Sequence, residues 1–341
     1  MVLQLLKAAI AAVVFAALAG GVAGSHSLAG AAANETSQKA AWLAYWDLAD
    51  GVKDLERIAG RLEQLSYFGA YFDQNDDIFI PQELSGQKAE LQQNQGQYET
   101  YLTFVNDKQN ADGSVIVKDI ALLRRLFADE ETMDRHIGEI IALTLQGGYD
   151  GIEIDYERVW QDEQVGQSYL VFAERLYKEA LANNLKLRLV LEPGTPFDSA
   201  GFFRGPEYVV MFYNLYGLHS GPGPKANAEF IRKILTQMEA LPGGKAAAFS
   251  TGGCLWGDDG EKRFLTEVQA NTLAVTHARD PRRDKESQCL VFEYQDKGVS
   301  YQVWYTDVQT LNYWAAIARE QGVNRINLWR LGGNAAIDRI N

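Results

Sequence analysis

Short apolar runs alternate along the chain with longer segments in which apolar residues recur at helical spacing. In one such segment Tyr169, Phe172 and Leu176 follow one another every three or four residues, which is the spacing of one helix face. Alternating strands and helices predict a parallel sheet, because each helix returns the chain to the same end of the sheet. The apolar runs predict eight strands: Ala41–Trp46, Leu65–Phe68, Tyr101–Val105, Gly151–Asp155, Leu185–Leu191, Tyr208–Tyr213, Ala246–Ser250 and Ile326–Trp329.

Eight strand–helix units in 341 residues predict an α/β fold, a closed (β/α)8 TIM barrel. The connection between the seventh and eighth strands is too long for a simple crossover. Within it, Leu290–Gln295 and Val299–Tyr305 flank a turn and predict a β-hairpin, while Glu261–Ala278 predicts a helix. We therefore expect a barrel formed by residues 38–257 and 306–341, with a small α+β insertion at 258–305 beside its mouth.

The first 33 residues have the pattern of an export signal. Lys7 precedes the apolar run Ala8–Ala19, and small residues follow at 22–24 and 31–33, where a signal peptidase could cleave. The run is shorter than the roughly 20 residues that a membrane-spanning helix needs. An uncleaved anchor is the alternative. We expect residues 1–33 to be a signal peptide and the mature chain to be secreted, or located in the periplasm or cell envelope, without a membrane span.

Composition narrows the choice of partner. The chain has 32 basic and 45 acidic residues, a net charge of −13, so nucleic acid is not an expected partner. Cys254 and Cys289 lie far apart and could form one disulfide or remain two buried thiols. The four histidines are scattered, which argues against a histidine metal site. We expect a monomer that uses neither a metal nor an organic cofactor.

One predicted strand carries a file of carboxylates. Glu153, Asp155 and Glu157 are two residues apart, so they point to one side, the barrel interior, with Glu157 nearest the carboxyl end where barrel active sites lie. Like charges this close do not all ionise near neutral pH, so Glu157 can keep a proton and act as a general acid. A Mg²⁺ or Ca²⁺ site is the alternative, but no supporting Asp/Asn/Gly loop is evident.

This stretch resembles the DxxDxDxE motif of glycoside hydrolase family 18, the chitinase-like family. Asp150, Asp155 and Glu157 match the first, third and fourth acidic positions, whereas Glu153 stands where the commoner form has Asp. Other segments resemble the same family. Residues 211–214 resemble its MxYD/N motif, and Trp329 resembles its pocket-floor tryptophan. Segments 303–307 and 328–333 resemble the branch of bacterial spore-cortex-lytic enzymes, the peptidoglycan N-acetylglucosaminidases.

The resemblance implies substrate-assisted hydrolysis that retains the anomeric configuration, with the 2-acetamido oxygen of the substrate as nucleophile. Glu157 would protonate the leaving oxygen and then activate water, Asp155 would orient the acetamido group, and Tyr213 would donate its hydroxyl to that group. Asn106 and Asn214 end strands and could bind sugar hydroxyls or simply form turns. The expected substrate contacts are Glu153, Asp150, Asn214, Met211, Trp329, Asn106 and Trp46.

We therefore expect an exported glycosidase that cleaves β-1,4 bonds at N-acetylglucosamine in chitin-like or peptidoglycan glycans. A non-catalytic chitinase-like glycan-binding protein on the same fold is the alternative, as is an exported scaffold with a vestigial site. The presence of Glu157 and Tyr213 argues against both.

Overall fold

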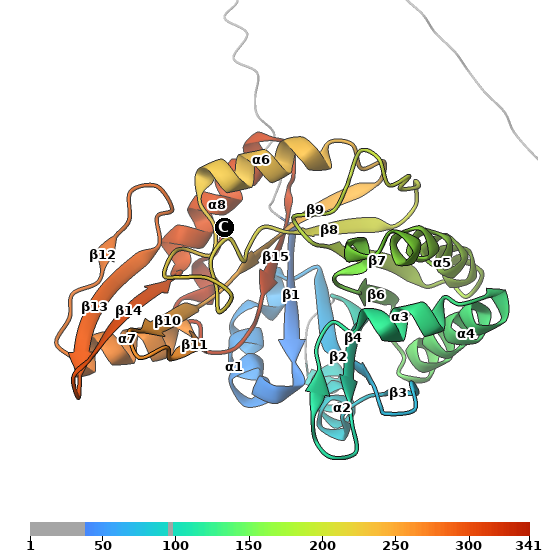
Figure 1. The fold of residues 1–341 in the computed structure, drawn as a ribbon, viewed down its shortest axis with the longest axis horizontal. Helices are drawn as coiled ribbons and strands as arrows, with labels where there is room; N and C mark the ends of the chain where they lie inside the picture. The colour runs from blue at the N-terminus through green and yellow to red at the C-terminus, as the bar shows by residue number, and fades with distance from the viewer. Residues whose placement is uncertain (1–37, 95–97) are drawn as a thin grey trace, which may run out of the picture. The chain divides into compact units, whose positions relative to one another are not determined.

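A computed structural model describes residues 38–94 and 98–341 (Figure 1). Its main sheet contains eight parallel strands that pair in a closed ring, in the order β1, β2, β4, β6, β7, β8, β9, β15 and back to β1. The predicted (β/α)8 barrel is thus confirmed. The barrel strands are β1 (Gln38–Ala44), β2 (Gln64–Phe72), β4 (Glu99–Gln109), β6 (Gly151–Asp155), β7 (Lys186–Leu191), β8 (Glu207–Met211), β9 (Gly244–Ser250) and β15 (Arg325–Trp329).

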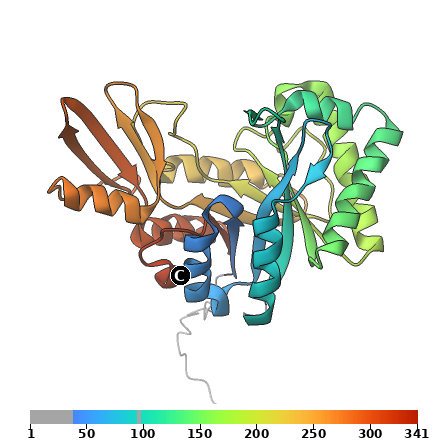
Figure 2. The same cartoon turned by 90° about the horizontal axis from the view of Figure 1, so that it is seen from below.

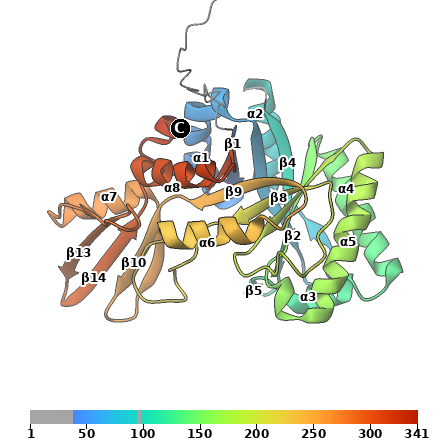
Figure 3. The same cartoon turned by 90° about the horizontal axis from the view of Figure 1, so that it is seen from above.

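Helices follow most of the barrel strands, although none lies between β7 and β8, and cover the outside of the barrel; Figure 3 shows α6 and α8 beside β8 and β9. Their amino ends are fixed by polar caps, since Asp129, Asp162, Asn227 and Asp307 each accept a hydrogen bond from a backbone N–H of the first turn. The helices are α1 (Leu48–Ile58), α2 (Gln82–Asn94), α3 (Ile120–Leu126), α4 (Glu130–Gln146), α5 (Glu163–Ala182), α6 (Ala228–Met238) and α8 (Val308–Glu320); β3 (Ile78–Phe79) and β5 (Val115–Ile116) are short additions to β2 and β4.

Alternation along the strands divides the apolar side chains into two cores. Leu187 and Leu189 of β7 pack in the layer between strands and helices, whereas Val190 faces the interior of the barrel. Ile152 and Ile154 of β6 likewise belong to the outer layer, as the sequence predicts. The residues that alternate with Ile152 and Ile154 in β6 therefore face the interior of the barrel. These residues include the carboxylates Glu153 and Asp155.

The insertion between β9 and β15 consists of an antiparallel sheet and one helix, seen at the left of Figures 1 and 2. Helix α7 packs on one face of this sheet over Leu255, Phe292 and Tyr305. The predicted hairpin is confirmed, but the sheet already starts at Gly253, before the expected boundary at 258, because β10 pairs with β14. The elements are β10 (Gly253–Gly257), β11 (Lys262–Leu265), α7 (Glu267–Thr276), β12 (Arg282–Arg283), β13 (Leu290–Asp296) and β14 (Val299–Tyr305).

The helix expected at 261–278 is therefore shorter than predicted. Its first part is β11, which pairs with β10, and Thr266 then caps α7. Cys254 and Cys289 are both buried and free, so the structure has two thiols rather than a disulfide. The predicted signal peptide, 1–33, lies outside the described residues. Within the described residues, no helix combines the length and the apolar character needed to cross a bilayer.

Candidate active site

Strand β6 carries the acidic motif to the carboxyl end of the barrel. It begins at Gly151, where a Cβ would lie 2.4 Å from the Tyr101 ring, so the close packing of the neighbouring strand requires glycine. Glu153 and Asp155 point inward and are buried, with exposed fractions of 0% and 8%. Glu157 follows two residues beyond and its side chain is 17% exposed. The motif thus runs from the barrel core to a position that a ligand can reach.

Glu157 is held in a mostly buried, charged environment. Burial raises the pKa of Glu157 to about 7; the positive charge of Lys118 opposes that rise, and Glu192 adds to it. Lys118 forms an ion pair with Oε2 of Glu157, and its side chain is 30% exposed. A carboxyl group with a pKa of about 7 can give up and recover a proton near neutral pH, which suits a general acid and base.

Asn106 fixes the backbone of Glu157 instead of facing a ligand. Its Oδ1 accepts a hydrogen bond from the Glu157 N–H at 2.9 Å, and its Nδ2 donates to the Glu157 carbonyl at 3.1 Å. The side chain is 1% exposed and its amide group is used by these two hydrogen bonds, so the position of Asn106 does not support a contact with substrate, which stays a prediction. Asn106 ends up as a positioning residue because the ends of β4 and β6 are adjacent in the ring.

Asp155 and Tyr213 lie below Glu157 in the barrel interior. Burial, followed by the negative charges of Glu157 and Glu153, raises the pKa of Asp155 well above its usual range. Its Oδ1 is buried and has no hydrogen-bond partner within the described residues. Burial also raises the pKa of Tyr213, with Asp155 as the largest charge effect. An unpartnered buried carboxylate oxygen is costly, so Asp155 is ready to accept a hydrogen bond from a ligand.

Glu153 lies in the barrel core among protein partners, so its position does not support a contact with substrate, which stays a prediction. Trp42 Nε1 donates to its Oε1, and Thr103 Oγ1 donates to the same atom at 2.7 Å. Arg188 of β7 lies 3.3 Å from Oε2 and is 1% exposed. These partners use both carboxylate oxygens of Glu153, and Arg188 is its ion-pair partner in the barrel core.

Asp150 lies outside the site, at the amino end of β6. Its Oδ2 accepts hydrogen bonds from the backbone N–H and the hydroxyl of Thr100, at 2.7 and 2.9 Å. This places it at the end of the strand opposite to Glu157, where it ties β6 to β4. The expectation that Asp150 contacts substrate is therefore not supported by its position.

Aromatic rings line the barrel interior and reach its mouth. Met211 and Tyr213 belong to one buried cluster with Trp42 and Phe68, against which Trp329 packs. The Trp329 ring lies 4.7 Å from Phe68 and 6.4 Å from Trp46, centroid to centroid. Trp46 is 50% exposed and Trp329 is partly exposed. These two tryptophans are suitably placed to stack against a sugar ring, whereas Met211 packs in the core.

Asn214 is exposed and follows β8 with a positive φ of 66°. Its Oδ1 accepts a hydrogen bond from Lys225 Nζ at 3.4 Å. Asparagine adopts the left-handed backbone conformation more readily than most residues, so Asn214 is suited to the turn after β8. Its exposed amide group directly follows Tyr213 in the sequence.

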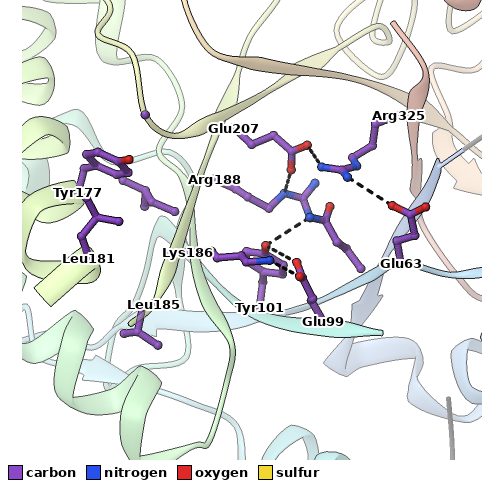
Figure 4. A pocket seen from close by; sticks show the side chains of 13 residues that line it. Glu63, Glu99, Tyr101, Tyr177, Leu181, Leu185, Lys186, Arg188, Glu207 and Arg325 are labelled. Carbon is purple, nitrogen blue, oxygen red and sulfur yellow. Dashed lines mark hydrogen bonds and ion pairs between the residues drawn. The ribbon is translucent and has the colours of Figure 1, made fainter. Parts of the chain in front are cut away.

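A cavity of about 490 Å³ lies at the opposite end of the barrel (Figure 4). Four of its charged residues stand at the first positions of strands, Glu99, Lys186, Glu207 and Arg325, and two more, Glu63 and Arg188, also line it. They pair with one another, and Glu207 lies between Arg325 and Arg188, 3.1 Å from Arg188 Nε. This cavity therefore lies among the paired charges that close the amino-terminal end of the barrel, and it is separate from the site around Glu157.

The sequence analysis missed Lys118, Arg188 and Glu192. The sequence pattern could have indicated Arg188, because it is a charged residue at an inward position of a barrel strand, between the outward Leu187 and Leu189. No sequence pattern could have indicated Lys118, because it lies in a loop whose conformation depends on residues distant in the sequence. Among residues 38–94 and 98–341, no group of three or more His, Cys, Asp or Glu side chains is arranged to hold a metal ion.

Comparison with known proteins finds distant relatives that are named as glycosylases or cortex-lytic enzymes. No protein-family model matches the chain. The chain is 22% identical over 243 residues to the uncharacterized glycosylase YvbX of Bacillus subtilis, covering 66% of this chain and 70% of that one. It is 25% identical over 231 residues to a cortical fragment-lytic enzyme of Bacillus anthracis, covering 61% of this chain and about half, 52%, of the enzyme.

Solved structures share the fold at lower identity. The spore cortex-lytic enzyme SleL of Bacillus cereus superposes with a TM-score of 0.75 at 20% identity, covering 89% of this chain and 72% of that one. A chitinase of Chromobacterium violaceum superposes with a TM-score of 0.73 at 16% identity, covering 89% and 96%. The chain thus has the chitinase-like fold and, in sequence, resembles the spore-cortex-lytic branch of glycoside hydrolase family 18.

Proposed function

We propose that this chain is an exported glycoside hydrolase that cleaves β-1,4 bonds at N-acetylglucosamine by substrate-assisted, retaining catalysis. The observation that carries the proposal is the pairing of two carboxyl groups at the end of β6. Glu157 has a pKa raised to about 7, and Asp155 has a buried oxygen that finds no hydrogen-bond partner in the described part of the chain. The similarity to proteins named glycosylases, cortex-lytic enzymes and chitinases supports glycoside hydrolase activity.

In the first step Glu157 gives its proton to the glycosidic oxygen as the bond to the anomeric carbon breaks. The acetamido oxygen of the same sugar attacks that carbon from the other face and forms a cyclic oxazolinium ion. Asp155 accepts a hydrogen bond from the acetamido N–H and stabilises the positive charge, while Tyr213 donates to the acetamido oxygen. Trp329 supports the sugar from below by stacking.

In the second step the carboxylate of Glu157 takes a proton from water, and the resulting hydroxide opens the ring at the anomeric carbon. Two inversions leave the configuration retained, and Glu157 is again protonated. The glycan is chitin-like or peptidoglycan, since both contain a β-1,4-linked N-acetylglucosamine.

The alternative, a glycan-binding protein without activity, would use the aromatic mouth but would have no need of a titratable acid. A carboxyl group kept largely buried beside Asp155 and Glu192 costs stability at neutral pH. That cost is understandable where Glu157 moves protons, and it has no evident purpose in a protein that only binds. This argument favours the enzyme.

The proposal is tested with three tetrasaccharides and one inhibitor. The purified chain should hydrolyse chitotetraose, but not cellotetraose or fully deacetylated chitotetraose, because only an acetamido group can act as the internal nucleophile. A thiazoline analogue of N-acetylglucosamine should inhibit, since it resembles the cyclic intermediate. EDTA should leave the rate unchanged. Cleavage of cellotetraose, indifference to the thiazoline, or loss of activity on chelation would refute the mechanism.

A further inference from the structure

The environment of Glu157 contains a cation that the reaction described above does not require. Lys118 lies in the loop between β5 and α3, and its Nζ pairs with Oε2 of Glu157. Removing this cation would, by itself, make Glu157 a better-protonated acid at neutral pH, because Lys118 opposes the rise in its pKa. A residue that weakens the general acid in the free protein calls for another role.

The position of Lys118 is built by the same residues that place Glu157. The Lys118 N–H donates to Asp107 Oδ1 at 2.7 Å, and the N–H of Asp119 donates to the Asn106 carbonyl at 2.7 Å. Asn106 in turn exchanges two hydrogen bonds with the backbone of Glu157. Lys118 also has a positive φ of 57°, which is uncommon for a residue with a side chain. The pairing is therefore fixed by the ends of β4 and β6.

Carbohydrate geometry tells which part of a substrate meets this cation. Glu157 must contact the glycosidic oxygen, which is O4 of the leaving sugar, and O3 is bonded to the neighbouring carbon. A substituent on O3 therefore lies beside the carboxyl group that protonates O4. Lys118 contacts that carboxyl group and is 30% exposed, so its ammonium group can turn toward such a substituent.

We propose that Lys118 is a specificity-determining residue that recognises a lactyl ether on O3 of the leaving sugar, the group that distinguishes muramic acid from glucosamine residues. The carboxylate of the lactyl group accepts a charge-assisted hydrogen bond from Nζ. Within the peptidoglycan substrates of the proposed function, this residue would favour a cut between N-acetylglucosamine on the non-reducing side and N-acetylmuramic acid on the other. The inference rests on the proposed hydrolase function.

This contact also links recognition to proton transfer. When the lactyl carboxylate draws Lys118 away, burial and the negative charge of Glu192 remain, and both favour the protonated form of Glu157. A neutral chitin fragment leaves the ion pair with Lys118 in place. The anionic substrate thereby both binds Lys118 and helps Glu157 to hold the proton that the first step needs.

The test compares kcat/KM on two tetrasaccharides, chitotetraose and one that alternates N-acetylglucosamine with N-acetylmuramic acid. For Lys118→Met the ratio of muramic to chitin substrate should fall on the order of ten- to a hundredfold, the range for a charged hydrogen bond. Lys118→Arg keeps a cationic donor and should keep most of the ratio. Lys178→Met, on an exposed pair with Glu174 of α5, is the matched control and should change neither value.

The outcomes separate the two proposals. If the wild-type chain cleaves neither substrate, the proposed function fails. If it cleaves both and Lys118→Met changes both kcat/KM values by one factor, Lys118 only tunes Glu157 and the specificity inference is overturned. A lactyl methyl amide on the same tetrasaccharide should show a smaller effect of Lys118→Met than the free acid, because it accepts a neutral and weaker hydrogen bond.

Discussion

Glu157 should govern how activity depends on pH. Its pKa is raised to about 7, and it must be protonated to act on the glycosidic oxygen, so kcat/KM should fall as pH rises above about 7. A general acid stops working when it loses its proton, so the titration of Glu157 sets the fall of kcat/KM on the basic side of the pH profile, its basic limb. In Lys118→Met the limb should move to higher pH, because the cation that lowers the pKa of Glu157 is gone.

The assignment of that limb is checked with Glu157→Gln, which has nearly the same shape but no proton to give. Activity should drop by roughly 10²–10⁴-fold while the thermal transition and glycan binding persist. Glu174→Gln on the exposed face of α5 is the matched control and should behave as wild type. More than about a tenth of the wild-type rate in Glu157→Gln would mean that another group supplies the proton.

The residues of the site differ in how far their positions could be predicted. Asp155 is the last residue of β6 and Glu157 follows two positions later, so the alternation of the strand predicts the same side for both. Glu153 obeys the same rule, yet its partners, Trp42 and Arg188, come from strands distant in sequence, and their pairing cannot be foreseen from the motif. Lys118 depends on how one loop folds back onto the end of β4.

At the scale of elements, the ion pair between β6 and β7 offers a stability prediction. Arg188 and Glu153 are buried together in the barrel interior, 3.3 Å apart. Arg188→Met should lower the free energy of unfolding by about 3–5 kcal/mol, because it leaves the Glu153 charge without its cation in a dry core. Denaturant unfolding monitored by tryptophan fluorescence measures the change.

The double variant Arg188→Met with Glu153→Gln separates charge from packing. It should recover a large part of the stability that Arg188→Met loses, since Gln can still accept and donate hydrogen bonds without a buried charge. Full additivity of the two single changes would mean that the residues do not interact. The same substitution at Arg232, which is exposed on α6, should be close to neutral.

The barrel strands were predictable because each is an apolar run and most are separated from the next by a segment with helical spacing; β7 and β8 are joined without a helix. Their ends were less so: β4 extends to Gln109, beyond the apolar run that ends at Val105, because its last residues pair with β2 and β5. In the insertion, Lys262–Leu265 is a strand only because β10 provides a partner. Long-range pairing, absent from any local pattern, decides such segments.

For the molecule as a whole, the ring of parallel strands separates two tasks. Charged first residues of the strands pair at one end, as in Arg325 with Glu207 and Lys186 with Glu99, and close the barrel. The opposite end carries the acids after β6 and the tryptophans after β1 and in β15. Stability and chemistry are thus placed at different ends of the barrel, as in other barrels of this class.

Residues 1–33 should be removed when the full chain is exported. Every barrel strand lies at or after Gln38, so a chain that starts at Asn34 should keep the thermal midpoint and kcat/KM of the exported product. When the full chain is expressed in a bacterium with an export pathway, mass spectrometry of the extracytoplasmic fraction should find a mature amino terminus between residues 24 and 34. Recovery of the intact chain from washed membranes would instead show that residues 1–33 act as an anchor. The discriminating control carries Ala→Arg changes at positions 12 and 16, which interrupt the apolar run and should keep the chain in the cytoplasm with its activity unaltered.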